Sequence, residues 1–120
     1  MRDPTRGGLA AALCEIAAAS RVTISVDEKE LLVRPEVMAA CDLLGFDPLT
    51  VPNEGKMVVI CPASVEKLVL GAMKRHPLGR DARVVGEVLA EPQGRVVLRT
   101  CMGGQRIVDL PYGEQLPRIC

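Results

Sequence analysis

The sequence predicts an α+β domain in which a mixed, largely antiparallel sheet packs against helices. Helical and strand-like hydrophobic patterns alternate along the first part of the chain, and three strand patterns then follow one another. The 120 residues are 48% hydrophobic and 25% charged, which suits one packed core and is unlike a disordered protein. We expect a single domain over residues 1–110, followed by a mobile tail at residues 111–120.

The first elements are predicted from periodicity and from their end signals. Apolar residues recur every three or four positions from Leu9 to about Ala19, behind two glycines, which predicts a helix. Residues 22–26 are dominated by β-branched side chains and predict a short strand. A second helix is expected over residues 35–44, because a proline opens it and Gly45 can end it.

The middle of the chain predicts a buried strand and a third helix. Residues 56–61 form an almost continuous apolar run that stops at Pro62, which is typical of a central strand buried on both faces. Ser64 is expected to cap a helix that ends before Pro77. An apolar stripe runs along this helix, formed by Val65, Leu68, Val69, Ala72 and Met73.

Three further strands are expected at residues 83–90, 95–100 and 105–110. Turn-forming segments rich in glycine and proline separate them. Consecutive strands joined by short turns predict an antiparallel meander. Together with the earlier elements, the order is helix, strand, helix, strand, helix and three strands.

Charge and composition exclude several classes of protein. Lys and Arg number 15, Asp and Glu also 15, and there is one Phe, one Tyr and no Trp, which argues against a nucleic-acid partner. Charged residues interrupt every apolar run before the ~18 residues that cross a membrane. The five cysteines are odd in number and lack a CxxC pair, which excludes a disulfide framework and a zinc site. We therefore expect a cytoplasmic protein with no metal ligands of its own.

The glycine-opened start of the first helix is a candidate anion site. Free amide groups and the helix dipole favour a phosphate at such a position. The candidate binding residues are Asp3, Thr5, Arg6, Gly7 and Gly8. In the simpler alternative, Asp3 or Thr5 caps the helix and the glycines permit a turn.

Cys120 is the last residue, at the end of a ten-residue extension beyond Leu110. Fully extended, such an arm spans about 33–36 Å, so its thiol could carry a group from one site to another. The alternative is an incidental cysteine on a frayed terminus.

Glu54, in a loop before residues 56–61, is the candidate general base. A solvated loop carboxylate is the alternative. His76 has no acidic or cysteine neighbour at ligand spacing and is interpreted as a helix-terminal residue. The other cysteines are expected to pack as small apolar side chains: Cys14, Cys41, Cys61 and Cys101.

With these motifs in view, the whole chain resembles the C-terminal domain of the HypE family of hydrogenase maturation proteins. That family belongs to the superfamily of aminoimidazole ribonucleotide synthase, whose other members lack the Pro-Arg-Ile-Cys end. The similar segments are residues 1–10, Asn53-Glu54-Gly55, His76-Pro77-Leu78-Gly79 and Leu116-Pro117-Arg118-Ile119-Cys120. One departure is Cys14, where the family commonly has Asn. The resemblance implies a ferredoxin-like-related fold.

The resemblance also implies a function in building the [NiFe] hydrogenase active site. Cys120 would accept a carbamoyl group from HypF. That carbamoyl group would then be dehydrated, with ATP and Mg²⁺, to give a thiocyanate. The cyanide would then pass to iron on the HypC–HypD complex. Glu54 would be the base, and residues 3–8 would contribute to the ATP phosphate region. The intact protein would be a homodimeric enzyme, whereas this chain alone would be monomeric, inactive and without bound ATP.

Two other functions remain open at this point. The chain could be an ATP-using synthase or kinase domain of the same superfamily, which would leave Cys120 without a role. It could also be a noncatalytic binding module of ferredoxin-like type.

Overall fold

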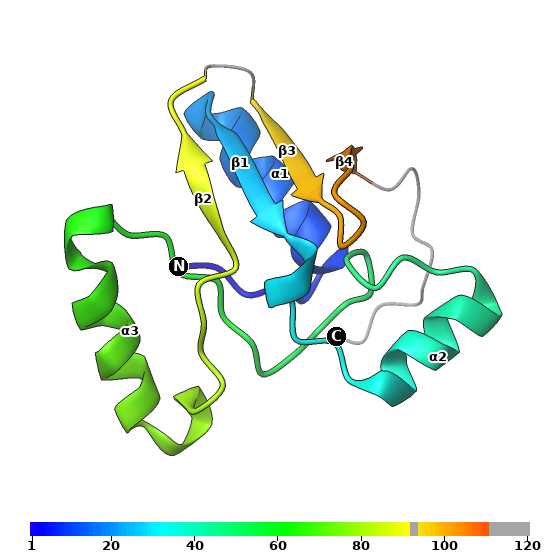
Figure 1. The fold of residues 1–120 in the computed structure, drawn as a ribbon, viewed down its shortest axis with the longest axis horizontal. Coiled ribbons are helices and arrows are strands. Elements are labelled where there is room, and N and C mark those ends of the chain that lie inside the picture. Colours follow the sequence, from blue (N-terminus) through cyan, green and yellow to red (C-terminus); the bar gives the residue numbers. More distant parts are fainter. Residues whose placement is uncertain (92–93, 111–120) are drawn as a thin grey trace.

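The computed structural model describes residues 1–91 and 94–110, in which a four-stranded sheet carries a helix on one face (Figure 1). The strands are β1 (Thr23–Asp27), β2 (Gly86–Leu89), β3 (Arg95–Arg99) and β4 (Gln105–Val108), in the order β2-β1-β3-β4. β1 is parallel to β3, and the other two pairs are antiparallel. The predicted α+β class with a mixed, largely antiparallel sheet is confirmed.

The predicted meander is wrong, because β1 lies between β2 and β3. Ile24 is opposite Val88 on one side and opposite Val96 on the other. Residues 23–26 of β1 are all buried, so the central position suits this strand best. Only β3 and β4 form the expected hairpin. Turn signals between strands indicate where a strand ends but leave open which strand it pairs with.

The core lies between the sheet and helix α1 (Gly8–Ser20), which crosses behind β1 and β3 in Figure 1. Small side chains on the buried side of α1 let the helix approach the sheet closely. The core consists of Ala10, Leu13 and Ala17 from α1, Ile24 and Val26 from β1, Val96 and Leu98 from β3, Val108 from β4, and Leu49 from a loop. The helix predicted from Leu9 to about Ala19 and the strand predicted at residues 22–26 are confirmed.

Residues 56–61 do not form the predicted central strand. Val58 makes one isolated bridge with Arg2, and Met57 and Ile60 are 58% and 44% exposed. An apolar run of this kind forms a buried strand only where a neighbouring strand is free to pair with it. Here β1 already has a partner on each side, and the N-terminal segment offers a single paired residue.

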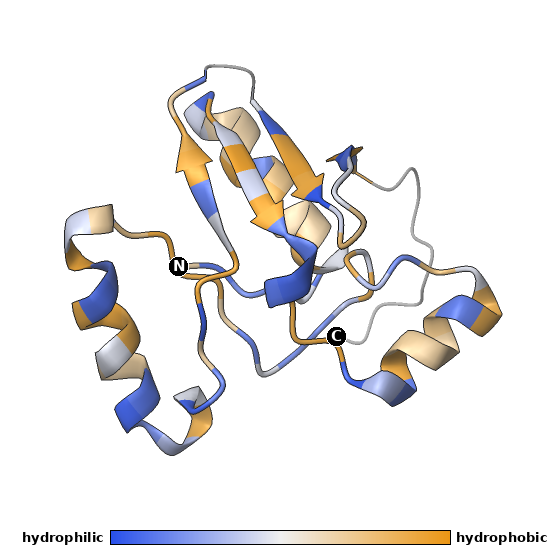
Figure 2. Cartoon of the chain, viewed as in Figure 1, coloured by the Kyte–Doolittle hydropathy of each residue, from blue (hydrophilic) through white to orange (hydrophobic). Residues whose placement is uncertain are grey.

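Helices α2 (Pro35–Leu44) and α3 (Glu66–Arg75) lie on either side of the sheet and away from it (Figure 1). Both are where the sequence predicts them, but α3 has no buried residue and α2 has only Cys41. Leu68, in the predicted apolar stripe, is 70% exposed. Figure 2 shows the apolar segments of both helices.

Short 3₁₀ turns complete the fold, at η1 (Glu28–Glu30), η2 (Ala63–Val65) and η3 (Pro77–Gly79). The predicted capping of α3 by Ser64 is wrong. Ser64 lies inside η2, and α3 begins two residues later without a side-chain cap. Ser64 therefore takes part in the 3₁₀ turn η2 instead of capping α3.

Candidate functional site

The N-terminal segment before α1 runs alongside the loop that contains Glu54. Arg2 and Val58 exchange backbone hydrogen bonds of 3.0 and 2.7 Å. The Asn53 amide donates to the Pro4 carbonyl oxygen at 2.9 Å. The glycine-rich segment and the candidate base, which are remote in the sequence, are therefore brought side by side.

Glycine is required at the start of α1 by both conformation and space. Gly7 and Gly8 have φ angles of 63° and 65°, in the left-handed region that other residues rarely adopt. A Cβ atom on Gly8 would lie 2.4 Å from the Leu49 carbonyl oxygen and 2.7 Å from that of Val51. The loop at residues 49–51 is thus packed directly against the Gly8 backbone.

A backbone carbonyl, and not a side chain, caps α1. The Ala10 amide donates to the Leu49 carbonyl oxygen at 2.8 Å, and α1 has no side-chain cap. The alternative in which Asp3 or Thr5 caps the helix is therefore wrong. The Thr5 hydroxyl instead donates to the Asp3 carboxylate at 3.1 Å.

This arrangement narrows what the start of α1 can bind. The Ala10 amide is already used, and Gly8 is buried against carbonyl oxygens, which repel an anion. The exposed Arg6 guanidinium and the partly exposed Gly7 turn are the groups best placed to contact a phosphate. Asp3, Thr5, Arg6, Gly7 and Gly8 remain predicted binding residues.

Glu54 is exposed at the tip of the neighbouring turn. Gly55, which follows it, has a φ angle of 74° and permits the reversal. Within the described part of the chain, the Glu54 side chain makes no hydrogen bond or ion pair. Its carboxylate is therefore accessible as a proton acceptor, and the backbone on either side sets its position.

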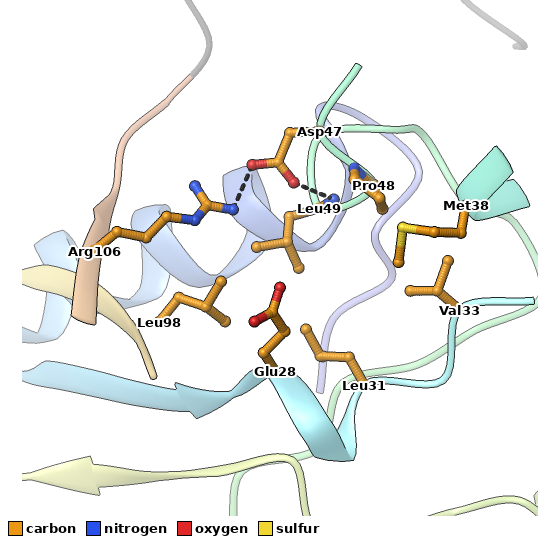
Figure 3. Close-up of a pocket in the computed structure, with 9 residues that line it drawn as sticks. All are labelled: Glu28, Leu31, Val33, Met38, Asp47, Pro48, Leu49, Leu98 and Arg106. Carbon is orange, nitrogen blue, oxygen red and sulfur yellow. Dashed lines mark hydrogen bonds and ion pairs between the residues drawn. The ribbon is translucent and has the colours of Figure 1, made fainter. Parts of the chain in front are cut away.

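Asp47, which no sequence pattern indicates as a site residue, anchors the loop before Glu54. The Asp47 carboxylate accepts a hydrogen bond from the Leu49 amide at 2.9 Å and another from Arg106 Nη2 of β4 at 2.5 Å (Figure 3). The pair lies at the edge of a pocket of about 50 Å³ whose lining includes Leu49 and Leu98. The run Asp47-Pro48-Leu49-Thr50 is typical of a turn, but no sequence signal indicates Arg106 as its partner.

Cys120 and the tail at residues 111–120 lie outside the described residues. The four described cysteines are free thiols. Cys41 is buried and Cys14 and Cys61 are partly buried, as expected for packing residues. The expectation is wrong for Cys101, which is exposed because it lies in the tight turn between β3 and β4.

The pKa values of two of these thiols are raised above the ordinary value for cysteine. Burial, with the Asp109 and Glu15 carboxylates, raises the pKa of Cys14, whose sulfur donates to the Val108 carbonyl oxygen at 3.1 Å. Partial desolvation and the Glu28 carboxylate raise the pKa of the Cys101 thiol. Since the thiolate is the nucleophile, neither is a good acceptor at neutral pH.

The remaining candidates have structural roles. His76 ends α3, and its Nδ1 accepts the Leu78 amide at 3.2 Å, which confirms a helix-terminal histidine.

Over residues 1–91 and 94–110, no three His, Cys, Asp or Glu side chains come together to hold a metal ion. None of the described helices is long and apolar enough to cross a membrane.

Residues 1–99 match the family model described as AIR synthase related protein, C-terminal domain. The chain is also 55% identical, over all 120 residues, to "Carbamoyl dehydratase HypE" of Cupriavidus necator. A crystal structure of the hydrogenase maturation protein HypE in complex with ATP superimposes with a TM-score of 0.90, at 41% identity over 99% of this chain and 37% of that one. A chain of a HypE–HypF complex gives a TM-score of 0.84, at 43% identity over 92% of this chain and 35% of that one.

The matched part of these proteins is limited. This chain covers 34% of the Cupriavidus necator protein and the same share of a relative from Rhizobium leguminosarum. It therefore spans about a third of the length of the curated relatives that it matches.

Proposed function

Because the chain belongs to the family of AIR synthase related C-terminal domains, we propose that it is the corresponding domain of an ATP-dependent carbamoyl dehydratase that matures [NiFe] hydrogenase. One structural observation carries the proposal beyond the family. The Asn53–Pro4 hydrogen bond and the Arg2–Val58 bridge hold the candidate base beside the candidate phosphate segment. A base and a phosphate region must both reach the same substrate in this reaction.

The reaction converts a carbamoylated cysteine to a protein thiocyanate. Water is difficult to remove from an S-carbamoyl group because oxide is a poor leaving group. Transfer of the ATP γ-phosphoryl group to the carbamoyl oxygen releases ADP and makes that oxygen part of a phosphate leaving group. Removal of the two N–H protons then lets phosphate leave as the C≡N bond forms. The products are a thiocyanate, ADP and phosphate.

Cys120 is the proposed acceptor, and we propose that residues 111–120 form the tail that carries it. Three of the described cysteines are poorer acceptors, because Cys14 and Cys101 have raised pKa values and Cys41 is buried. Residues 1–110 form the domain that receives the tail. A thiol on an arm of about 33–36 Å can be loaded by one protein and dehydrated at another site.

Glu54 is the proposed base that removes N–H protons. Its exposure leaves the carboxylate open to a substrate, and its turn lies beside the N-terminal segment that is predicted to bind phosphate. General-base catalysis of this kind contributes about 10²–10⁴-fold to the rate.

ATP fits this chain only in part, so the rest of the intact protein must supply most of its site. Arg6 and the Gly7 turn can contact phosphate oxygens, together with Thr5 when its hydroxyl turns away from Asp3. Mg²⁺ is assigned to the intact protein, as the family resemblance implies. The isolated chain is therefore expected to be inactive and monomeric, without bound ATP, whereas the intact protein forms a homodimer.

The proposed partners follow the two ends of the reaction. HypF supplies the carbamoyl group, and a solved HypE–HypF complex among the similar structures supports this partner. The HypC–HypD complex accepts the cyanide on iron. All of these steps take place in the cytoplasm, where free thiols persist.

The proposal is tested with Glu54→Gln in the intact protein. Glutamine keeps the shape of the side chain but cannot accept the proton. We expect Cys120 to be carbamoylated normally and thiocyanate formation to fall by about 10²-fold or more. Glu30→Gln, a change at an exposed carboxylate on η1, is the matched control and should dehydrate at the wild-type rate. Wild-type dehydration by Glu54→Gln would make Glu54 a solvated loop carboxylate.

A further inference from the structure

We propose that Asp47 and Arg106 are positioning residues for the dehydration step. Their ion pair holds the loop at residues 47–53 on the start of α1, and this loop sets where Glu54 stands relative to the Gly7-Gly8 turn. The inference rests on the function proposed above for Glu54. Neither residue contacts the predicted phosphate segment or Glu54 directly, so both would act through the backbone.

Asp47 organises the loop with both oxygens of its carboxylate. Oδ1 accepts a hydrogen bond from the Leu49 amide at 2.9 Å, and Oδ2 accepts one from Arg106 Nη2 at 2.5 Å. The Asp47 carbonyl oxygen also accepts the Thr50 amide at 2.9 Å and the Thr50 hydroxyl at 2.8 Å. One residue therefore forms the turn and also joins it to β4, as Figure 3 shows.

The same turn contacts α1 at its first residues. Its Leu49 carbonyl oxygen accepts the Ala10 amide, while the carbonyl oxygens of Leu49 and Val51 lie 2.4 and 2.7 Å from the position of a Gly8 Cβ. The Leu49 side chain is buried in the core. Displacing the turn would therefore move the backbone that adjoins the Gly7-Gly8 turn.

The far end of the loop reaches Glu54. Asn53 donates to the Pro4 carbonyl oxygen at 2.9 Å, and Glu54 follows it. The Glu54 carboxylate has no hydrogen bond or ion pair to another described residue, so its position depends on the backbone. The segment is held at Asp47 and at Asn53, and loss of the Asp47 anchor would loosen the backbone that positions the base. A displacement of about 1 Å can lower a rate by about 10²-fold.

The ion pair is suited to positioning more than to stability. The Arg106 and Asp47 side chains are 44% and 32% exposed, a setting in which an ion pair adds little to the free energy of unfolding. A variant of this pair is therefore expected to fold and still lose rate. That combination separates positioning from a general loss of structure.

The experiment uses the intact protein, carbamoylated in advance with HypF and carbamoyl phosphate, in a single turnover with saturating ATP. The first-order rate constant of thiocyanate formation reports positioning, while the amplitude reports the folded fraction. For Arg106→Gln we expect the rate constant to fall about tenfold with an unchanged amplitude. Arg106→Lys, which keeps the charge, should recover most of the rate.

The Asp47 variants test the two functions of the carboxylate separately. Asn can still accept the Leu49 amide but loses the ionic contact with Arg106, whereas Ala loses both. We expect Asp47→Asn to match Arg106→Gln and Asp47→Ala to be slower. The double variant Asp47→Asn/Arg106→Gln should be no slower than either single variant, because the two changes remove one interaction.

The matched control is Arg99→Gln on β3. Arg99 is 42% exposed and pairs with Glu87 and Asp27, so it resembles Arg106 but does not contact the loop. Its rate constant should equal that of the wild type. Hydrogen exchange of residues 47–54 should rise in Arg106→Gln and stay unchanged in Arg99→Gln.

The outcomes separate this inference from the proposed function. A wild-type protein that forms no thiocyanate would overturn the proposed function. A wild-type protein that does so, with an equal rate constant in Arg106→Gln, would overturn the positioning role alone. Unchanged hydrogen exchange at residues 47–54 in Arg106→Gln would overturn it as well, as would an equal loss of rate in Arg99→Gln.

Discussion

Replacing Gly8 with alanine tests how the start of α1 is built. The substitution places a Cβ 2.4 Å from the Leu49 carbonyl oxygen and 2.8 Å from the Thr50 carbonyl carbon. These are backbone atoms of a loop that is itself anchored by Asp47, so they cannot move aside as the end of a flexible side chain would. Gly8 also has a φ angle of 65°, which alanine rarely adopts.

The expected loss of stability has two parts. The left-handed conformation costs a non-glycine residue about 1–2 kcal/mol. Forcing a methyl group into occupied space costs about 1–3 kcal/mol more. We therefore expect Gly8→Ala to lower the free energy of unfolding by about 3 kcal/mol, a large share of the total for a small domain.

Gly45→Ala is the matched control, because Gly45 has a φ angle of 70° but no atom within 4 Å of its Cβ position. It should lose only the conformational part, about 1–2 kcal/mol. Urea unfolding of the 120-residue chain, followed by circular dichroism, measures both. Equal losses at the two glycines would refute the close packing of the loop against Gly8.

Two further predictions concern the cysteines whose pKa values are raised. The folded state raises the pKa of Cys14 above 9.0, so folding favours the neutral thiol over the thiolate. The contribution of this thiol to the free energy of unfolding is complete below pH 9.0 and is lost as the pH rises through the raised pKa. The free energy of unfolding should therefore fall more steeply above pH 9.0 in the wild type than in Cys14→Ala, and an equal slope in urea unfolding would contradict this. Glu28→Gln removes a carboxylate that, together with desolvation, raises the pKa of Cys101, so alkylation of that thiol by iodoacetamide at pH 8 should become faster. An unchanged alkylation rate would contradict the contact.

Elements whose own residues carry the signal were predictable from the sequence. α1 and α2 appear where periodicity and end signals predict them, and β1, β3 and β4 follow the β-branched runs. Pairing was not predictable, because it depends on which strand competes best for the centre of the sheet. β1 takes that position, and residues 56–61 are left with a single bridge to Arg2.

The candidate site shows the same division between local and distant information. Gly7 and Gly8 were recognisable as a turn because positive φ angles favour glycine. The cap at Ala10 was not, since it is a carbonyl oxygen of Leu49, and every residue offers a carbonyl. Arg106 was equally hidden, because a surface arginine on a strand has no sequence feature that identifies its partner.

The carbamoyl carrier is the central claim, and intact-mass and peptide mass spectrometry test it most directly. The full-length protein is incubated with HypF, carbamoyl phosphate and ATP, beside a Cys120→Ala variant. We expect Cys120 to gain one carbamoyl group and then lose one water, and the alanine variant to remain unmodified while folding normally. A carbamoyl group in the alanine variant, or one found in the wild type on Cys14, Cys41, Cys61 or Cys101, would contradict the account.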